Sequence, residues 1–98
     1  MLDGMYVVEV DTLMGRELGQ LFLKTEGDIV YMSVDAPVLG KQRFEGRAHG
    51  NTFVIEGAWK LLVLGKVEYR VNGTLYGDDL ALDIKTSKGD TRAVGIRI

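Results

Sequence analysis

The chain has 98 residues, of which 12 are basic and 14 acidic, and it has no cysteine. A length of this order suits one domain, so we expect a single domain over residues 1–98. The lack of cysteine excludes disulfides and thiolate metal sites and is typical of a reducing compartment, which predicts a cytoplasmic protein. The formal net charge is −2 and the basic residues are scattered, which argues against nucleic acid as a partner.

The N-terminal residues give no sign of a targeting segment. Met1-Leu2-Asp3-Gly4 lacks the basic start and apolar stretch of a signal peptide, so we expect none. The longest apolar run, Leu61 to Leu64, is too short to cross a membrane. We therefore expect no membrane span.

Apolar and polar residues alternate along the chain with the period of two that is typical of β-strands. In the first run, Tyr6, Val8 and Val10 share one face. The faces that we expect to point inward in the following runs carry Leu21 and Leu23; Val30, Met32 and Val34; Phe44, Gly46 and Ala48; Phe53, Ile55, Gly57 and Trp59; Val67, Tyr69, Val71, Gly73 and Leu75; and Leu80, Leu82 and Ile84.

The last run, about Thr91 to Ile98, leaves its facing open. One face carries Val94, Ile96 and Ile98, and the other carries Ala93, Gly95 and Arg97. The pattern nevertheless predicts an eighth strand, and no segment has the periodicity of a helix.

Two kinds of turn separate these runs, and they alternate along the chain. The polar turns are Glu26-Gly27-Asp28, His49-Gly50-Asn51 and Tyr76-Gly77-Asp78-Asp79, and the apolar turns are Leu13-Met14-Gly15, Val38-Leu39-Gly40 and Val63-Leu64-Gly65. Successive turns of an up-and-down meander fall at opposite ends of the sheet. The alternation therefore predicts one polar end and one apolar end, with the turn Ser87 to Asp90 at the apolar end.

The predicted fold is all-β, an eight-stranded antiparallel up-and-down meander barrel. Twisted antiparallel strands with one apolar face can bury that face by closing on themselves, which also removes both sheet edges. No connection is long enough for a Greek-key crossover. A flattened two-sheet β-sandwich is the alternative.

In this pattern of eight short strands, the chain resembles the small meander barrels of the calycin group, which are the lipocalin-like, fatty-acid-binding and avidin-like proteins. Gly4-Met5-Tyr6 stands where lipocalins carry Gly-x-Trp, with tyrosine in place of tryptophan. The resemblance implies a small ligand or a protein partner at the barrel mouth.

The apolar end is the main functional clue, because hairpin tips are usually polar. We expect non-enzymatic binding of a small apolar ligand that enters at this end and rests on inward aromatic rings. The candidate ligand-binding residues are Leu13, Met14, Val38, Leu39, Phe44, Phe53, Trp59, Val63, Leu64 and Tyr69. In the alternative interpretation, the side chains of the apolar turns fold inward and plug the barrel.

Glycines at inward positions bear on whether the interior is hollow. Gly46, Gly57 and Gly73 could leave a pocket, or neighbouring aromatic rings could fill the space that they leave. Of the inward aromatic residues, Tyr6, Trp59 and Tyr69 could also contribute hydrogen bonds.

Two other functions stay open. The chain could be a structural or accessory module that docks through its apolar end or the Trp59–Leu64 strand, on itself as a homodimer or on a larger protein. It could also be an enzyme with Tyr69 or Tyr6 as a general acid, although we predict no carboxylate or histidine at an inward position. We expect no cofactor and no metal, since Gly77-Asp78-Asp79 fits a hairpin turn.

Overall fold

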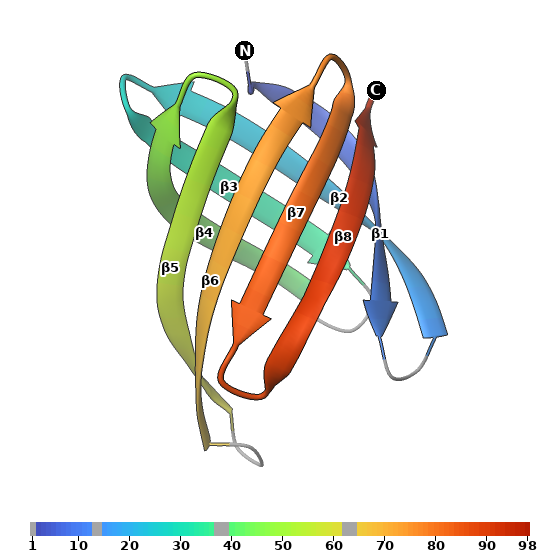
Figure 1. Cartoon of the computed structure of the whole chain (residues 1–98), viewed down its shortest axis with the longest axis vertical. Helices are drawn as coiled ribbons and strands as arrows, with labels where there is room; N and C mark the ends of the chain where they lie inside the picture. Colours follow the sequence, from blue (N-terminus) through green and yellow to red (C-terminus); the bar gives the residue numbers. More distant parts are fainter. Residues whose placement is uncertain (1, 13–14, 37–39, 62–64) are drawn as a thin grey trace.

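The computed structural model describes residues 2–12, 15–36, 40–61 and 65–98, and for Thr12, Trp59 and Leu61 it describes only the backbone. The described residues form eight strands: β1 (Gly4–Thr12), β2 (Gly15–Glu26), β3 (Ile29–Ala36), β4 (Gly40–His49), β5 (Thr52–Leu61), β6 (Gly65–Tyr76), β7 (Asp79–Thr86) and β8 (Gly89–Arg97). Each strand pairs antiparallel with the next, and β8 pairs with β1, which closes the barrel (Figure 1). The predicted meander barrel is confirmed, and the sandwich alternative is wrong. The described part of the chain contains no helix that is long and apolar enough to cross a membrane.

Tight turns close one end of the barrel. The two-residue turns at 27–28, 50–51 and 77–78 each begin with a glycine whose φ is 62°. A glycine with positive φ at the first central position is the arrangement of a type II′ hairpin turn. These three turns and both chain termini lie at the upper end of Figure 1, which we call the polar end. The apolar turns Leu13-Met14, Val38-Leu39 and Val63-Leu64 fall outside the described residues.

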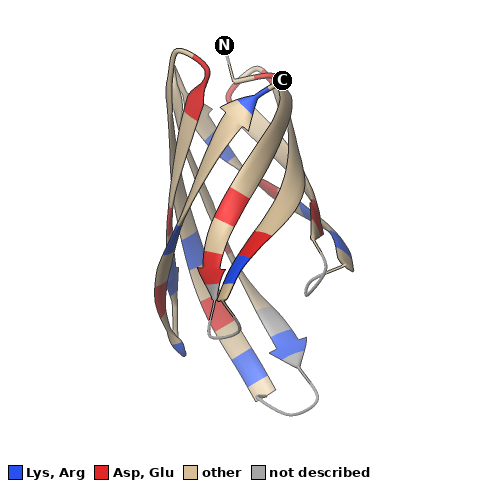
Figure 2. Cartoon of the chain, turned by 90° about the vertical axis from the view of Figure 1, so that its right-hand side faces the viewer, with Lys and Arg blue, Asp and Glu red and all other residues tan. Residues whose placement is uncertain are grey.

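The predicted inward faces of β1 to β7 are confirmed by burial, except that Gly57 on β5 is exposed and the side chain of Trp59 is not described. The core is a continuous cluster of buried side chains: Leu2, Tyr6, Val8, Leu21, Leu23, Val30, Met32, Phe53, Ile55, Val71, Leu75, Leu80, Leu82 and Ala93. The alternating outward positions of the same strands carry most of the charged residues, and Figure 2 shows acidic and basic residues distributed along the strands. The ion pairs among them, such as Arg47 with Asp28 at 3.0 Å, are exposed and contribute little stability.

Strand β8 turns its small residues inward. Ala93 is 2% exposed and Gly95 is buried, whereas Val94 and Ile96 are 58% and 60% exposed. A side chain at Gly95 would meet the side chain of Val8 on β1, so glycine is needed where the two strands pack. The larger apolar residues of β8 consequently face outward.

The ladder between β4 and β5 is the shortest in the barrel. These strands pair only over Arg47–His49 and Thr52–Val54, whereas β5 pairs with β6 along its whole length. Below the paired part, β4 and β5 diverge in Figure 1. We call this divergence, between residues 40–45 of β4 and 56–61 of β5, the seam.

Candidate functional site

The polar end of the barrel is closed from inside by the N-terminal segment. The side chain of Leu2 is 1% exposed and lies in the core cluster. The Tyr6 hydroxyl donates a hydrogen bond of 2.6 Å to the Leu2 carbonyl. Burial raises the pKa of Tyr6, and the nearby Arg97 guanidinium opposes this in part. Tyr6 is therefore protonated, and its hydroxyl already donates to the Leu2 carbonyl inside the core. This hydroxyl is poorly placed to act as a general acid.

Arg97 and Asp3 fix this segment in place. The Asp3 carboxylate accepts hydrogen bonds from the Thr25 amide at 3.1 Å and the Thr25 hydroxyl at 2.6 Å. Arg97 donates to the Asp3 carbonyl at 3.2 Å and to the Asp78 carboxylate at 3.0 Å. Its guanidinium carbon lies 5.8 Å from the centroid of the Tyr6 ring, a cation–π distance. These contacts make the polar end an unsuitable entrance for a ligand.

The opposite half of the interior is less completely buried. Five apolar residues that point inward from five strands pack against the core cluster but are only partly buried: Val10, Val34, Phe44, Tyr69 and Ile84. We call these five residues the inner apolar ring. Because they lie between the packed core and the strand ends that face away from the polar end, they form the candidate ligand-binding surface.

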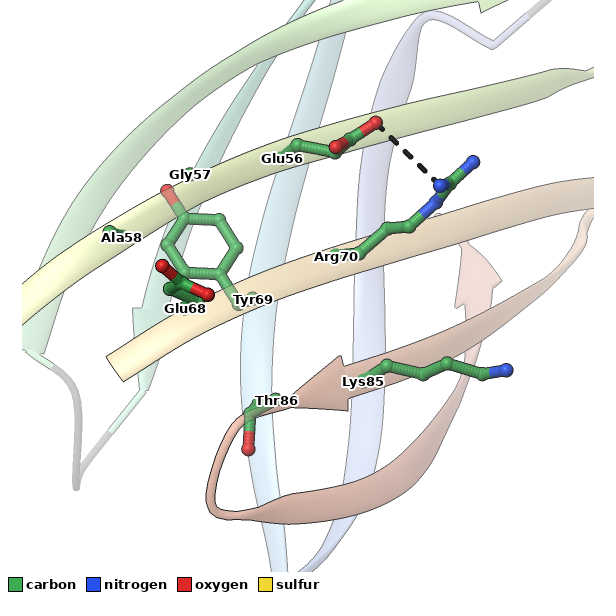
Figure 3. A pocket seen from close by; sticks show the side chains of 8 residues that line it. All are labelled: Glu56, Gly57, Ala58, Glu68, Tyr69, Arg70, Lys85 and Thr86. Carbon is green, nitrogen blue, oxygen red and sulfur yellow. Dashed lines mark ion pairs between the residues drawn. The ribbon is translucent and has the colours of Figure 1, made fainter. Parts of the chain in front are cut away.

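The inner apolar ring contains two of the predicted site residues in direct contact. The rings of Phe44 and Tyr69 meet edge to face, with centroids 5.6 Å apart and planes at 85°. The Tyr69 ring lies over Gly57, where a side chain on β5 would collide with it (Figure 3). Burial raises the pKa of the Tyr69 hydroxyl, which keeps it protonated at neutral pH.

Phe53, in contrast, belongs to the packed half. It is 1% exposed, and its ring occupies the space that a side chain at Gly73 would need. Aromatic rings therefore fill the space at Gly57 and Gly73, the second of the two possibilities that the sequence left open. For Trp59 the structure describes only the backbone, which pairs with Val67. The remaining predicted site residues, Leu13, Met14, Val38, Leu39, Val63 and Leu64, lie outside the described residues.

Polar side chains also occupy inward positions near the inner apolar ring. Four partly buried polar residues share the inward face of their strands with the apolar residues: Glu17, Gln42, Thr86 and Thr91. The expectation of no inward carboxylate is wrong for Glu17. Strand β2 begins at Gly15, so the alternation of Leu23 and Leu21 continues back to Glu17. The Thr91 hydroxyl donates to the Asp11 carbonyl at 3.0 Å, which links β8 to β1 at this end.

Inward and outward residues of β5 to β7 together line a depression beside the inner apolar ring. The depression, of about 550 Å³, lies over β5 to β7 and is lined by Glu56, Gly57, Ala58, Glu68, Tyr69, Arg70, Lys85 and Thr86 (Figure 3). Its charges are mixed, and Glu56 forms an ion pair with Arg70 at 3.8 Å. Among the described residues, no group of three or more histidine, aspartate or glutamate side chains could hold a metal ion.

An exposed apolar strip runs over β1, β2 and β8. Its residues, which define the outer apolar strip, are Met5, Val7, Phe22, Val94, Ile96 and Ile98. Val7 lies opposite Ile96, and Met5 lies opposite Phe22, so the strip is continuous across the three strands. The predicted docking strand Trp59–Leu64 is described only in part, because the side chains of Trp59 and Leu61 are not described and residues 62–64 lie outside the described residues.

Comparisons with known proteins support the fold and provide no family. No protein-family model matches the chain, and no curated protein sequence matches it. A solved redesigned β-barrel, b11L5F_LGL, is similar over 99% of this chain and 91% of its own, with 15% identity and a TM-score of 0.66. Another redesigned β-barrel, mFAP1 bound to DFHBI, is similar over 99% of this chain and 94% of its own, with 12% identity and a TM-score of 0.69. The chain therefore has the fold of these eight-stranded barrels, and its resemblance to the calycin group stays a prediction.

Proposed function

We propose that this protein binds a small, uncharged aromatic ligand against the inner apolar ring. The observation that carries the proposal is the uneven burial of the interior. The polar half is packed, with Leu2, Tyr6 and Phe53 each at most 1% exposed. The five side chains of the inner apolar ring, in the other half, keep part of their surface in water. A ligand that covered them would gain about 25 cal/mol per Å² of apolar area, before the costs of association.

The preference for an uncharged ligand follows from the inward polar groups at this end. Glu17 contributes an acidic group, and the described inward residues around the inner apolar ring include no lysine or arginine. A carboxylate ligand such as a fatty acid would find no cation to pair with there and would be repelled by Glu17. Phe44 and Tyr69 offer aromatic edges and faces to a flat ring.

The barrel mFAP1, which shares the fold, is described as bound to DFHBI. This supports a small-molecule role for a barrel of this fold. A calycin-like binding role agrees with the same proposal.

Titration with the neutral dye Nile red tests the proposal, with Phe44→Ala and Phe22→Ala as a matched pair. Phe44 lies in the inner apolar ring, and Phe22 lies in the outer apolar strip and is 44% exposed. Loss of about 1–2 kcal/mol of apolar contact should weaken dye binding about five- to thirtyfold in Phe44→Ala. Phe22→Ala should bind the dye like the parent protein, and oleate should compete poorly. If Phe22→Ala were the weaker binder, the dye would occupy the outer strip and the proposal would be wrong.

A second candidate function is docking of the outer apolar strip on another protein. The observation that favours it is the continuity of this strip, in which Val94, Ile96 and Ile98 are 58%, 60% and 72% exposed. Exposed apolar patches of this kind often mark interaction surfaces. Under this proposal Ile96→Asp abolishes association with the partner and leaves Nile red binding unchanged.

A further inference from the structure

The seam exposes main-chain hydrogen-bonding groups at two strand edges. The Leu75 amide donates to the Asn51 carbonyl at 2.9 Å. Main-chain groups of successive residues in a strand point to opposite sides, so the odd-numbered residues of β5 direct their N–H and C=O groups toward β6. The even-numbered residues Glu56, Ala58 and Lys60 therefore direct their N–H and C=O groups toward the seam. On β4, the Ala48 amide donates to the Asp28 carbonyl at 2.8 Å, so the even-numbered residues of β4 bond toward β3. The odd-numbered residues of β4 therefore direct their N–H and C=O groups toward the seam.

Side-chain charges explain why the ladder stops. If the register of Arg47 with Val54 continued, Glu45 would lie opposite Glu56, and Lys41 would lie opposite Lys60. All four side chains are exposed, and like charges directly opposite one another destabilise a strand pair. The two edges that could close the seam thus repel each other.

The same β5 edge is complementary to itself. In an antiparallel pair of two β5 edges related by a two-fold axis at Ala58, Glu56 of each copy lies opposite Lys60 of the other. In this pairing, even-numbered residues of one copy lie opposite even-numbered residues of the other. These are the β5 residues whose N–H and C=O groups point toward the seam, so they can bond to each other. Ala58 is exposed and lines the depression over β5 to β7, so no bulky side chain occupies the axis.

We propose that this protein forms a two-fold symmetric dimer in which the β5 edges of two copies pair antiparallel over residues 56–60. Three pairs of residues would contribute about six main-chain hydrogen bonds, two for each pair. Unpaired edges readily add another strand, and a two-fold interface requires a self-complementary surface, which this edge provides. The interface is small, so the dimer is weak and forms in the micromolar range. Because the inner apolar ring faces the interior, this inference is independent of ligand binding.

Two charge-reversal variants, Glu56→Lys and Lys60→Glu, test the dimer by native mass spectrometry and sedimentation velocity. Each variant alone places like charges opposite one another at both ends of the interface, so each should be monomeric where the parent protein dimerises. Mixed together, the two variants restore an opposite charge at every position. The mixture should therefore give a heterodimer, which native mass spectrometry identifies when one of the two variants is labelled uniformly with ¹⁵N.

Further variants separate this interface from the alternatives. Ala58→Pro removes a seam-facing amide without removing a bond to β6, so it should lower dimer affinity at least tenfold and leave the fold intact. Glu45→Lys attracts Glu56 and should close the seam, which lowers dimerisation and raises amide protection from hydrogen exchange at residues 41–45. Lys24→Glu, at an exposed position of β2 away from the seam, is the matched control and should dimerise like the parent.

Three results would overturn the proposal. The first is a parent protein that stays monomeric at millimolar concentration. The second is a mixture of Glu56→Lys and Lys60→Glu without a heterodimer while both variants keep the parent circular dichroism spectrum. The third is dissociation by Ile96→Asp together with retention in Ala58→Pro, which would place the dimer interface on the outer apolar strip.

Discussion

Phe44 and Tyr69 connect β4 to β6 beside the seam, with ring centroids 5.6 Å apart and planes at 85°. The described ladder between β4 and β5 has ended before this level, at Arg47 and Val54. Tyr69 reaches over β5 because Gly57 has no side chain there. The aromatic pair therefore supplies a side-chain contact between two strands that flank β5, where backbone pairing with β4 is lacking.

A double-mutant cycle of Phe44→Leu and Tyr69→Leu should show this contact directly. An edge-to-face aromatic pair contributes about 0.5–1.5 kcal/mol beyond the area that it buries. We therefore expect a coupling energy of that size in the free energy of unfolding, measured with urea. Additive single effects would mean that the two rings do not stabilise each other.

Gly73 and Phe53 form the corresponding pair in the packed half of the barrel. A side chain at Gly73 would collide with the Phe53 ring, which is 1% exposed. Gly73→Ala should destabilise the protein by about 1–3 kcal/mol through overpacking. In a Phe53→Leu background, which shortens the side chain over Gly73, the cost of Gly73→Ala should fall by at least half. If Gly73→Ala destabilised both backgrounds equally, the loss of stability would come from the backbone of β6 and not from contact with Phe53.

The N-terminal closure should depend on Arg97 more than on other surface arginines. Arg97 contacts the Asp3 carbonyl, Asp78 and the Tyr6 ring, whereas Arg92 on the same strand contacts only Asp83 among the described residues. Arg97→Met should lower the thermal midpoint and increase hydrogen exchange at the Thr25 amide. Arg92→Met should change neither, and equal effects of the two substitutions would contradict a specific role for Arg97.

Alkaline pH should destabilise the fold through its buried tyrosines. Burial raises the pKa of Tyr6 and of Tyr69 above the ordinary value of 10.0. The unfolded chain therefore loses these protons first, so their contribution to stability is present below about pH 10 and is lost as the pH rises through the folded-state pKa. Each tyrosine can lower the unfolding free energy by up to about 1.4 kcal/mol per pH unit in that window.

Tyr6→Phe separates this contribution from other alkaline effects. At neutral pH the variant loses the hydrogen bond to the Leu2 carbonyl and should be about 1–3 kcal/mol less stable. Above pH 10 its stability should decline less steeply than that of the parent, so the two urea midpoints should converge. Parallel decline of both proteins would show that Tyr6 ionises equally in the folded and unfolded states.

Strand faces and turns could be predicted from the sequence because both have short-range physical causes. Alternation of apolar and polar residues placed the inward faces of β1 to β7, and glycine followed by aspartate or asparagine marked the turns of the polar end. Strand β8 could not be oriented in this way. Apolar residues occur on both of its faces, and the small residue Gly95 faces inward only because Val8 of β1 needs the space.

The candidate site could be predicted only in part. The sequence predicts Phe44 and Tyr69 as inward aromatic residues, but their contact depends on a glycine on a third strand. Glu17 was missed because the alternation in β2 passes through Gly19, which carries no hydrophobic signal. The seam depends on the register of β4 against β5, and only a continuation of that register would place Glu45 opposite Glu56.

The central claim is that a small uncharged aromatic ligand binds to the inner apolar ring, and methyl NMR tests it most directly. Val34 and Ile84 belong to the ring, whereas Val94 and Ile96 are matched residues of the outer apolar strip. Titration of methyl-labelled protein with the neutral dye Nile red should shift the Val34 and Ile84 methyl signals and leave those of Val94 and Ile96 in place. Shifts confined to Val94 and Ile96, or no shifts at saturating ligand, would contradict the claim.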